Sequence, residues 1–414
     1  MSFLWGKKAH HPKPAELVSL TLEAWARVRA QDNSTHSSAQ ESGGRASFSG
    51  SSDNAASSRP TSAKSDSSSR PTSGRLGSRR QDASPASSTK DLDELTERLA
   101  ALRKAMTPTA GDAKEEETAR TVATEASAPG VDLLAALVAM LPRVPFEGKK
   151  DAAAIFQGLM RTTDADGKCH ALAHVVARGG MLASIAEKYD APDEALHAGC
   201  MLKECVRHEE LAQMALTDEE VMDRLFTHAD DAHFDVASYA FGCLADLLTR
   251  FPAVVASTLG SKCDFFTKRL NVLIASENYV TRRQSLRLLA RTLQTPANLK
   301  PFTAPYVSDV SNLVLCMEAL RDSSKSIQGE AFHVVKIFIA NPVKPPDISA
   351  VLTANQPKLL RLLKSMPAPP PPPPSSGAGV AVRADAPSED ADIDSDLAEV
   401  IDELESMSPP SAAS

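Results

Sequence analysis

The amino-acid sequence predicts an all-α protein: an armadillo/HEAT-like helical-repeat solenoid with a disordered insert and a disordered C-terminal tail. Three observations predict this fold class. Apolar residues recur at helical spacing, five long amphipathic stretches follow one another at intervals of 41–47 residues, and strand patterns are nearly absent. Aromatic residues make up 5% of the chain, which is low for a β-sandwich and acceptable for a helical protein built on Ala and Leu.

An amphipathic helix is expected at the N-terminus. Pro14 suits the first turn of a helix, and Leu17, Trp25 and Val28 recur at helical spacing. We interpret residues 1–32 as a capping helix that covers an exposed repeat end. A membrane-surface helix is the alternative, and the acidic residues of this segment disfavour it.

Residues 33–90 contain 20 serines, eight basic and four acidic residues, and almost no large apolar side chains. Such a segment cannot bury enough surface to offset the entropy of ordering it, so we predict a disordered insert. Three Arg-x-x-Ser patterns make Ser62, Ser73 and Ser78 candidate phosphosites, whose modification would change the charge of the insert. The alternative is low-complexity drift without a function.

The helical-repeat domain is assigned to residues 91–366. It opens with a leucine-rich helix ending near Met106, and residues 107–129 are predicted to be a polar loop. The long stretches then begin near Lys149, Asp193, Phe234, Tyr279 and Ser326, and shorter helices are expected at 131–141, 171–188, 218–228, 261–275, 306–321 and 357–365. Because each helix pair has too little apolar surface to be stable alone, we expect the pairs to stack into one core with a concave side.

The last segment, residues 367–414, begins with a proline tract and ends with an acidic stretch. Six prolines at 369–374 predict a polyproline II helix, either a stiff spacer or a ligand for aromatic-lined grooves. Residues 384–407 hold ten acidic residues and no basic one. Apolar residues at helical spacing up to Leu404 leave two readings: a solvated acidic tail, or a short helix that docks on a basic groove, including one on the same chain.

Composition and motifs disfavour several functional classes. The net charge of −8 is concentrated in the acidic tail, and the nearly neutral body is unlike a general nucleic-acid binder. The six cysteines form no C-x-x-C pair, and the longest apolar run is far shorter than the roughly 18 residues of a membrane span. We therefore expect reduced thiols in a cytoplasmic protein that binds neither nucleic acid nor membrane.

No motif indicates catalysis or a bound cofactor. The sequence Asp164-Ala165-Asp166-Gly167 resembles the start of a calcium loop but lacks the third ligand and the closing Glu. No Walker loop, G-x-S-x-G or G-x-G-x-x-G is present. We expect no enzyme, no cofactor and no metal.

The most informative residues are basic ones at the edge of the fourth long stretch. Arg283, Arg287 and Arg291 follow one another at i, i+4 and i+8 beside a stripe of leucines. They form either a solvated helix edge paired with acids, or an array of donors for carboxylates or phosphates on a partner. Lys203 and Arg207, two repeats earlier, extend this basic strip.

Several blocks of the sequence carry a resemblance to a known family. They are MSFLWGKK at 1–8, FEGKKD at 146–151, MLKECVRHE at 201–209, FDVAS at 234–238, DLLTR at 246–250, SENYVTRRQSL at 276–286 and IQGEAFHV at 327–334. These blocks closely resemble the calcium-binding protein 39 family, also called mouse protein 25. The resemblance covers about residues 130–365.

This resemblance implies a non-catalytic kinase regulator. Members of the family bind the STRAD pseudokinase, which with them activates the tumour-suppressor liver kinase, and they activate germinal-centre kinases directly. The resemblance places Tyr279, Arg283 and Arg287 on the helix that faces the kinase. It places Met317 in a C-terminal pocket that takes a Trp-Glu-Phe-type tail of the partner.

The chain departs from the family at the partner-contact turn, where Pro296 and Leu299 replace an Arg and an aromatic residue, and in the tail pocket, where Val314 replaces a Lys. We expect a scaffold that binds and allosterically activates a germinal-centre-type protein kinase or pseudokinase through its concave face. The alternative is an armadillo-type adaptor in cytoskeletal or cell-polarity assembly, without kinase activation, with a polyproline-binding protein as a further partner.

Overall fold

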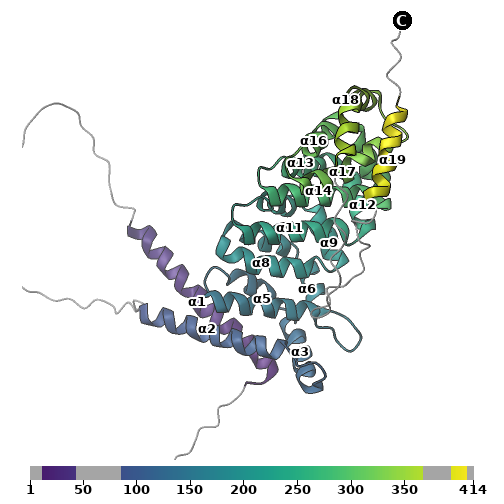
Figure 1. The fold of residues 1–414 in the computed structure, drawn as a ribbon. Helices are drawn as coiled ribbons and strands as arrows, with labels where there is room; N and C mark the ends of the chain where they lie inside the picture. Colours follow the sequence, from purple (N-terminus) through teal and green to yellow (C-terminus); the bar gives the residue numbers. More distant parts are fainter. Residues whose placement is uncertain (1–11, 43–84, 367–392, 408–414) are drawn as a thin grey trace, which may run out of the picture. The chain divides into compact units, whose positions relative to one another are not determined.

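The computed structural model describes residues 12–42, 85–366 and 393–407 (Figure 1). Every regular element within these ranges is a helix, and none is a strand, which confirms the predicted all-α class. The N-terminal block, most of the predicted insert with Ser62, Ser73 and Ser78, and the proline tract lie outside the described residues.

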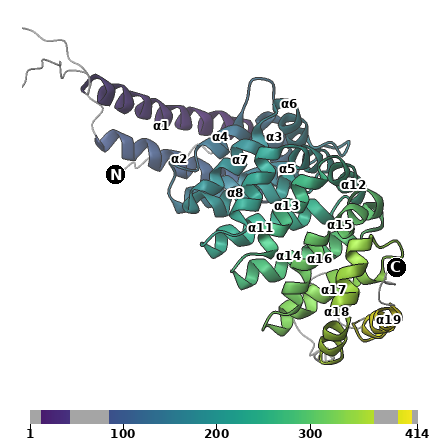
Figure 2. The same ribbon diagram turned by 90° about the horizontal axis from the view of Figure 1, so that it is seen from above.

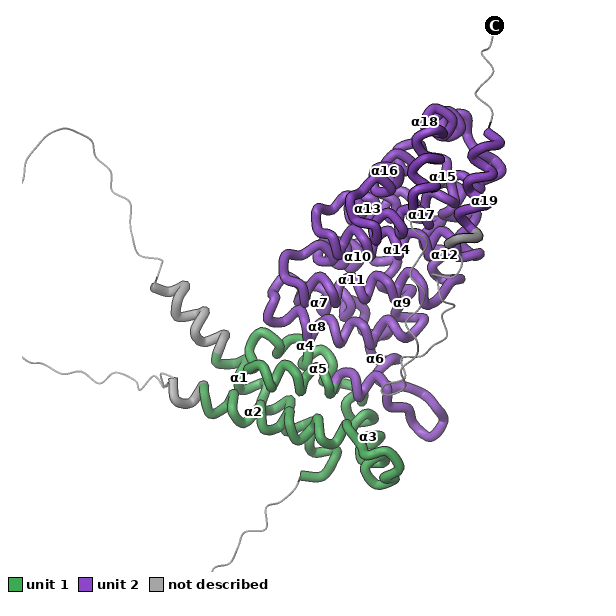
Figure 3. The backbone as a smooth tube through the Cα atoms, viewed as in Figure 1, with its two compact units in different colours: residues 1–155 green, residues 156–414 purple. Residues whose placement is uncertain are grey.

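The chain divides into two compact units, residues 1–155 and 156–414 (Figure 3). The first unit contains α1 (Pro14–Ser42), α2 (Pro85–Met106), α3 (Ala113–Ala126), α4 (Leu133–Ala139) and the beginning of α5 (Phe146–Arg161). The apolar face of α1, with Leu17, Trp25 and Val28, is buried, and α1 packs against α2, α3 and α4. Helix α1 continues to Ser42 and α2 begins at Pro85, so both helices extend into the segment 33–90. The prediction of a disordered insert is therefore wrong for residues 33–42 and 85–90.

The predicted loop at 107–129 is wrong, because it contains α3. Asp112 caps this helix by accepting hydrogen bonds from the backbone N–H groups of Lys114 and Glu115. The buried stripe of α3 consists of small side chains, among them Ala119 and Val122. Small side chains produce a weak apolar pattern in the sequence. Residues 107–129 were therefore predicted to be a polar loop.

The second unit contains most of the helical repeats. Its elements after the end of α5 are α6 (His170–Arg178), α7 (Met181–Ala186), η1 (Glu187–Asp190), α8 (Pro192–Cys205), α9 (Glu209–Thr217), α10 (Glu219–His228), α11 (Phe234–Thr249), α12 (Pro252–Ser261), α13 (Cys263–Ile274), α14 (Tyr279–Gln294), η2 (Pro296–Asn298), η3 (Leu299–Thr303), α15 (Ala304–Ser308), α16 (Val310–Leu320), α17 (Lys325–Ala340), α18 (Pro346–Lys364) and α19 (Ile393–Ser406). The long helices α8, α11, α14 and α17 begin within one residue of their predicted starts.

The long helices stack side by side in chain order within this unit (Figures 1 and 2). Neighbouring long helices contact one another, and α11, α14 and α17 each also pack against the shorter helix before them: α10, α13 and α16. The leucines of α14 at positions 286, 289 and 293 are completely buried between these neighbours. This order of packing is that of a helical-repeat solenoid, as predicted.

Capping residues fix where the helices begin. The side chains of Asp218, Asn278, Asp309 and Ser324 each accept a hydrogen bond from a first-turn backbone N–H of the helix that follows. Pro192 occupies the first position of α8, where no N–H donor is needed.

Several shorter elements differ from the prediction. The sequence reading missed α9 and α12, and it joined segments that the structure divides into α6 and α7 and into α15 and α16. It also began the last repeat helix at Pro357, whereas α18 begins at Pro346 and continues through that proline. Ile348 and Leu352 are buried in this first half of α18, and their packing outweighs the hydrogen bond that Pro357 cannot make.

The prediction that the chain after Pro367 does not pack is wrong for residues 393–407. These residues form α19, which packs against α17 and α18 (Figures 1 and 2). Val400 and Leu404 are buried in this contact. The docked-helix reading of the acidic tail is therefore correct, and the solvated-tail reading is wrong for this part.

No single described helix is both long and apolar enough to span a membrane. The pair α11 and α12, bent by 97° at its break, meets the length and composition criteria only when the two are counted together.

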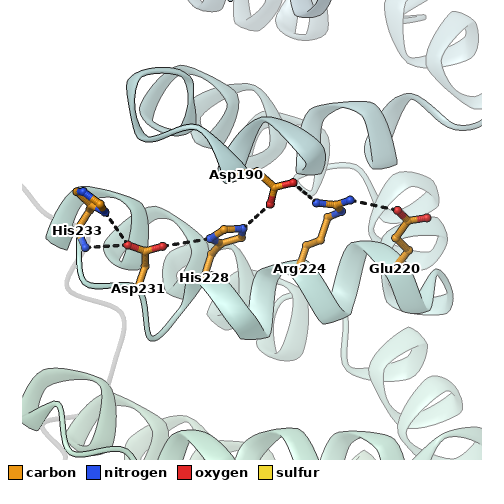
Figure 4. Close-up of polar contacts among 6 residues, drawn as sticks. All are labelled: Asp190, Glu220, Arg224, His228, Asp231 and His233. Atoms are coloured by element: carbon orange, nitrogen blue, oxygen red, sulfur yellow. Dashed lines mark hydrogen bonds and ion pairs between the residues drawn. The ribbon is translucent and has the colours of Figure 1, made fainter. Parts of the chain in front are cut away.

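A polar network joins η1 to α10 and to the turn after it (Figure 4). Asp190 lies 2.9 Å from Nε2 of His228 and 2.5 Å from a guanidinium nitrogen of Arg224. Asp231 lies 3.3 Å from Nδ1 of the same His228. Because Asp190 ends η1 whereas its two partners lie on α10, the network ties together two elements that α8 and α9 separate in the chain.

The carboxylate of Asp190 should stabilise the fold at neutral pH. Burial opposes its charge, but hydrogen bonds from His228 and Arg224 lower the pKa of Asp190 below its ordinary value. A lowered folded-state pKa gives a stabilisation that is present above about pH 3.9 and is lost as the pH falls through the lower, folded-state value. We expect Asp190→Asn to cost about 1 kcal/mol at pH 7, discounted for exposure, and little at about pH 3.

Urea unfolding followed by circular dichroism at the two pH values would measure this difference. Glu220→Gln is the matched control, because this carboxylate has nearly the same exposure as Asp190, 62% against 57%, but contacts only Arg224 of its own helix, at 3.4 Å. It should change stability by less than about 0.5 kcal/mol. An equal cost of Asp190→Asn at both pH values would show that its charge has no role.

A second prediction concerns the close contact between Gly199 of α8 and Tyr239 of α11. A Cβ atom added to Gly199 would lie 2.8 Å from Cβ of Tyr239. Gly199→Ala should therefore destabilise the protein by about 1–3 kcal/mol, because neither backbone can move without opening the core. Gly329→Ala on α17 is the control, since no atom lies within 4 Å of its added Cβ. Helix propensity predicts that it is neutral or stabilises by up to about 1 kcal/mol. Equal urea midpoints for the two variants would refute the packing argument.

Candidate partner-binding face

Two adjoining hollows lie on one exposed face of the long helices, which we call the long-helix face. The first, of about 480 Å³, is lined by side chains from the end of α5, from α8 and from α11. The second, of about 390 Å³, is lined by α11 and α14. Ser238 lines both hollows, so they form one continuous surface.

The arginine row of α14 lines the second hollow. Arg283, Arg287 and Arg291 project from successive turns of one helix, as their spacing predicts. A guanidinium nitrogen of Arg287 lies 2.7 Å from Oε1 of Glu330 on α17. Nε of Arg283 lies 3.4 Å from the same oxygen but is not aligned for a hydrogen bond. Glu330 is only 10% exposed, so a nearly buried carboxylate holds two arginines that remain about half exposed.

Tyr279 and Arg291 mark the two ends of this row. Tyr279 is exposed at the first turn of α14, and hydrogen bonds with Ser326 and Ser324 near the start of α17, together with nearby Arg283, lower the pKa of its hydroxyl. Arg291 is exposed, and its guanidinium has no ion pair within the described ranges.

The first hollow repeats the same arrangement. The carboxylate of Glu204 on α8 is 4% exposed, and it lies 2.5 Å from a guanidinium nitrogen of Arg161 and 3.6 Å from Nε of Arg207. The hydrogen bond with Glu204 raises the pKa of Arg161 further. Both arginines remain more than half exposed.

A third carboxylate, Asp246 on α11, lies between two more cations. Its Oδ1 accepts a hydrogen bond from Arg250 at 3.2 Å, and its Oδ2 lies 3.9 Å from Nζ of Lys203 on α8. Oδ2 itself is buried without a hydrogen-bond partner. Lys203 also lies over Gly242, where an added Cβ would be 3.3 Å from its Nζ.

In all three arrangements a carboxylate on one long helix lies within 4 Å of a cation on the preceding long helix. Seven cations line the two hollows, against two acids. Carboxylates lie within 4 Å of the guanidinium groups of Arg161, Arg207, Arg283 and Arg287, and these side chains remain 41–56% exposed. Such groups bind carboxylates or phosphates with bidentate geometry.

The structure brings together all of the predicted basic residues, Lys203, Arg207, Arg283, Arg287 and Arg291, on this face. Sequence reasoning missed other members of the face: Arg161, Arg250, Glu204, Asp246 and Glu330. Their signal was weak, because each ion pair between helices joins residues about 43 or more positions apart.

Met317 lies elsewhere. It lines a separate hollow of about 430 Å³ between α16 and α18, together with Val314, Lys358 and Leu359. Met317 is half-buried and Val314 is exposed. The structure therefore separates the predicted tail pocket from the arginine row.

One residue of the altered turn after α14, Asn298, packs inside the protein rather than facing a partner. The side-chain amide of Asn298 is buried and donates a hydrogen bond of 2.8 Å to the carbonyl of Thr292. Leu299, which replaces an aromatic residue of the family, is exposed. Pro296 opens the short helix η2.

The Asp164–Gly167 sequence forms a turn in which the carboxylate is already engaged. Oδ1 of Asp164 accepts the backbone N–H groups of Asp166 and Lys168, and Oδ2 lies 2.9 Å from Nε2 of His170. Across the described ranges, no group of three or more His, Cys, Asp or Glu side chains is placed to hold a metal ion.

Comparisons with known proteins agree with the resemblance seen in the sequence. A family model described as Mo25-like matches residues 59–369. The Degreening-related gene dee76 protein of Auxenochlorella protothecoides is 38% identical over 282 residues, which cover 68% of this chain and 87% of that protein. Calcium-binding protein 39-like of Mus musculus is 38% identical over 276 residues, which cover 67% and 80%. The Mo25-like protein of Schizosaccharomyces pombe is 38% identical over 229 residues, which cover 55% and 69%.

Among solved structures, a computationally designed armadillo repeat protein for modular peptide recognition aligns with a TM-score of 0.39 and 15% identity, covering 60% of this chain and 95% of that one. This likeness is too low to add to the repeat order seen directly in the helices. The family match spans well over half of the chain, and two of the relatives are matched over four fifths or more of their length. The chain belongs to the Mo25-like family.

Proposed function

We propose that this chain is a non-catalytic cytoplasmic scaffold that binds a protein kinase or pseudokinase of the germinal-centre or STRAD-like type on its long-helix face. By holding the kinase lobe, the scaffold favours the active conformation and so acts allosterically in signal transduction. Membership of the Mo25-like family supports a scaffold or regulatory role.

One observation carries this proposal: the cations of the long-helix face are positioned by shielded carboxylates. A free arginine on a surface loses side-chain entropy when it binds a partner. Arg283 and Arg287 are already restrained by Glu330, and Arg161 and Arg207 by Glu204. Four preorganised donors on a rigid helix stack suit a folded protein partner with acidic groups on its surface.

Met317 provides a second contact point in this proposal. Its hollow between α16 and α18 is lined by the apolar side chains of Val314, Leu359 and Leu362. A tail of the partner with aromatic residues would place them there, while its acidic residue would face Lys358. Two separated contacts on one scaffold increase the affinity for a partner that reaches both.

A second candidate function is an armadillo-type adaptor without kinase activation, in cytoskeletal or cell-polarity assembly. The turn of Pro296 and Leu299 favours it, because Asn298 is buried and the neighbouring position offers an aliphatic side chain in place of an aromatic one. In this function the proline tract at 369–374 binds a further partner.

Arg283→Glu should weaken binding of the kinase or pseudokinase about tenfold or more, because it removes a donor and places a second acid beside Glu330. Affinity can be measured by surface plasmon resonance with purified germinal-centre kinases and a STRAD-like pseudokinase. Lys268→Glu on α13 is the control, with the same change in charge at an exposed site on the other layer of helices. Equal affinities of the two variants would remove the long-helix face from the interface. Melting temperatures of both variants exclude unfolding as the cause.

The two candidate functions differ in their dependence on the proline tract. Replacing prolines 369–374 by a Gly-Ser segment of equal length leaves α19 and the long-helix face intact. The scaffold should then still bind and activate the kinase, with a change in activity of less than about twofold. An adaptor would lose its polyproline-binding partner and would not raise the activity of a purified kinase before or after the replacement.

A further inference from the structure

The helix α19 packs on the last helices of the second unit. It is joined to α18 by residues 367–392, and it packs against α17 and α18 (Figure 2). Val400 and Leu404, one turn apart, face the body and are buried. We call the surface beneath it the α19 groove, defined by Lys336, Lys344, Gln356 and Lys364.

The groove holds α19 through ion pairs as well as through the buried Val400 and Leu404. Lys336 pairs with Asp396, Lys344 lies 2.9 Å from Glu403, and Lys364 lies 2.7 Å from Glu405. Lys344 is only 10% exposed under the docked helix, whereas Lys364 is 55% exposed. Each lysine receives one acid from a helix whose last turn contains no basic residue.

Gln356 recognises the end of α19. Its side-chain amide donates hydrogen bonds to the backbone carbonyls of Leu404 and Met407, the latter at 3.3 Å. Carbonyl groups in the last turn of a helix have no partner within the helix. Because Gln356 binds backbone carbonyls, it can recognise the C-terminal end of a docked helix whatever the side chains of that helix are.

Taken alone, α19 is a poor helix. Glu399 and Glu403 lie four residues apart and repel each other, and the acids of the last turn oppose the helix dipole. A segment of 14 residues of this composition is marginal in water. The lysines of the groove supply the missing positive charge, so folding of α19 and docking are coupled.

The groove is larger than α19. A cavity of about 870 Å³ remains beside the helix, lined by the end of α14, η3, α15 and α17. Its walls include the exposed apolar side chains of Leu299, Ala304 and Val343, whereas α19 presents Asp396, Glu399, Val400 and Glu403 to it. The hollow is open to solvent, so a helix with larger apolar residues at the positions of Glu399 and Val400 would cover more of its exposed apolar surface and bind more tightly.

We propose that the α19 groove is a docking site for an acidic amphipathic helix of a partner protein, and that α19 is its exchangeable occupant within the chain. The partner helix has acids at the positions of Asp396, Glu403 and Glu405, an apolar residue at that of Leu404, and large apolar residues at those of Glu399 and Val400.

The tether decides which helix occupies the groove at rest. Because α19 belongs to the same chain as the groove, its docking is intramolecular and is favoured over that of a separate chain of equal intrinsic affinity. The groove therefore stays closed towards weak ligands and towards α19 of a second copy. A partner helix enters by filling the cavity, or when the tail is weakened.

The test uses the full chain and a fluorescent peptide of residues 391–408. Leu404→Asp in the chain releases its own helix and leaves the groove intact. The peptide should bind this variant at least about tenfold more tightly than it binds the unaltered chain, where α19 competes. A peptide carrying Glu399→Leu should bind more tightly than the native peptide, because it fills the cavity.

Charge reversals in the Leu404→Asp chain test the recognition. Lys344→Glu should weaken peptide binding about tenfold or more. Lys364→Glu, at an exposed position that tolerates substitution, should weaken it several-fold. In both variants peptide binding should depend less on salt concentration. Lys358→Glu, on the face of α18 that lines the Met317 hollow, is the control and should have no effect.

Three outcomes would overturn the proposal. They are equal peptide affinity for the unaltered and Leu404→Asp chains, equal affinity of the Lys344→Glu, Lys364→Glu and Lys358→Glu variants, and no gain from Glu399→Leu in the peptide. If the unaltered chain forms dimers and the peptide dissociates them, the groove instead binds α19 of a second copy. Kinase binding is not part of the readout, so the result is independent of the function proposed above.

Discussion

Each long helix of the second unit depends on its neighbours to shield its apolar stripe from water. On α14, the leucines at 286, 289 and 293 are completely buried between α11, α13 and α17. Each such side chain contributes roughly 1.5–3 kcal/mol relative to exposure, and no helix pair gains this by itself. Because every long helix turns the same stripe inward, each also turns the same edge outward. The alignment of Lys203, Arg207 and Arg283 on one face follows from this packing constraint.

Shielded carboxylates convert that edge into a site. Long cationic side chains on a free helix sample many conformations, and ordering them upon binding costs entropy. Glu204, Asp246 and Glu330 lie near the junction of consecutive helices and hold cations from the helix before. The same ion pairs link the repeats to one another. The same residues thus stabilise the stack and restrain the cations that bind a partner. Substitutions of these residues therefore need separate measurements of folding and of binding.

The end of the stack poses a different physical problem. Among the described residues no further repeat covers α17 and α18, and an uncovered repeat end exposes apolar surface. In this chain an acidic helix covers part of that end through Val400 and Leu404, while three lysines neutralise it. The cover is incomplete, and the cavity beside it distinguishes this end from the closely packed interior. An end cap that combines two buried apolar residues with partly exposed ion pairs is open to exchange with another helix of the same pattern.

The sequence alone determined the class, the repeat and the row of basic residues. Apolar spacing on α8, α11, α14 and α17 is strong and local, so their starts were predicted within one residue, and residues i, i+4 and i+8 of one helix necessarily share a face. The family resemblance rested on continuous blocks of residues and was confirmed by the comparisons.

Only the tertiary structure decided which acids hold those cations and what the acidic tail does. Glu204 meets Arg161, Glu330 meets Arg287 and Glu403 meets Lys344 across 43 or more positions, and no local pattern encodes such pairings. Helices such as α3 and the first half of α18 have small or proline-interrupted stripes that are stable only once neighbours cover them. Helical periodicity is a property of one segment, whereas ion pairs, caps and cavities arise from surfaces that become neighbours when the segments stack.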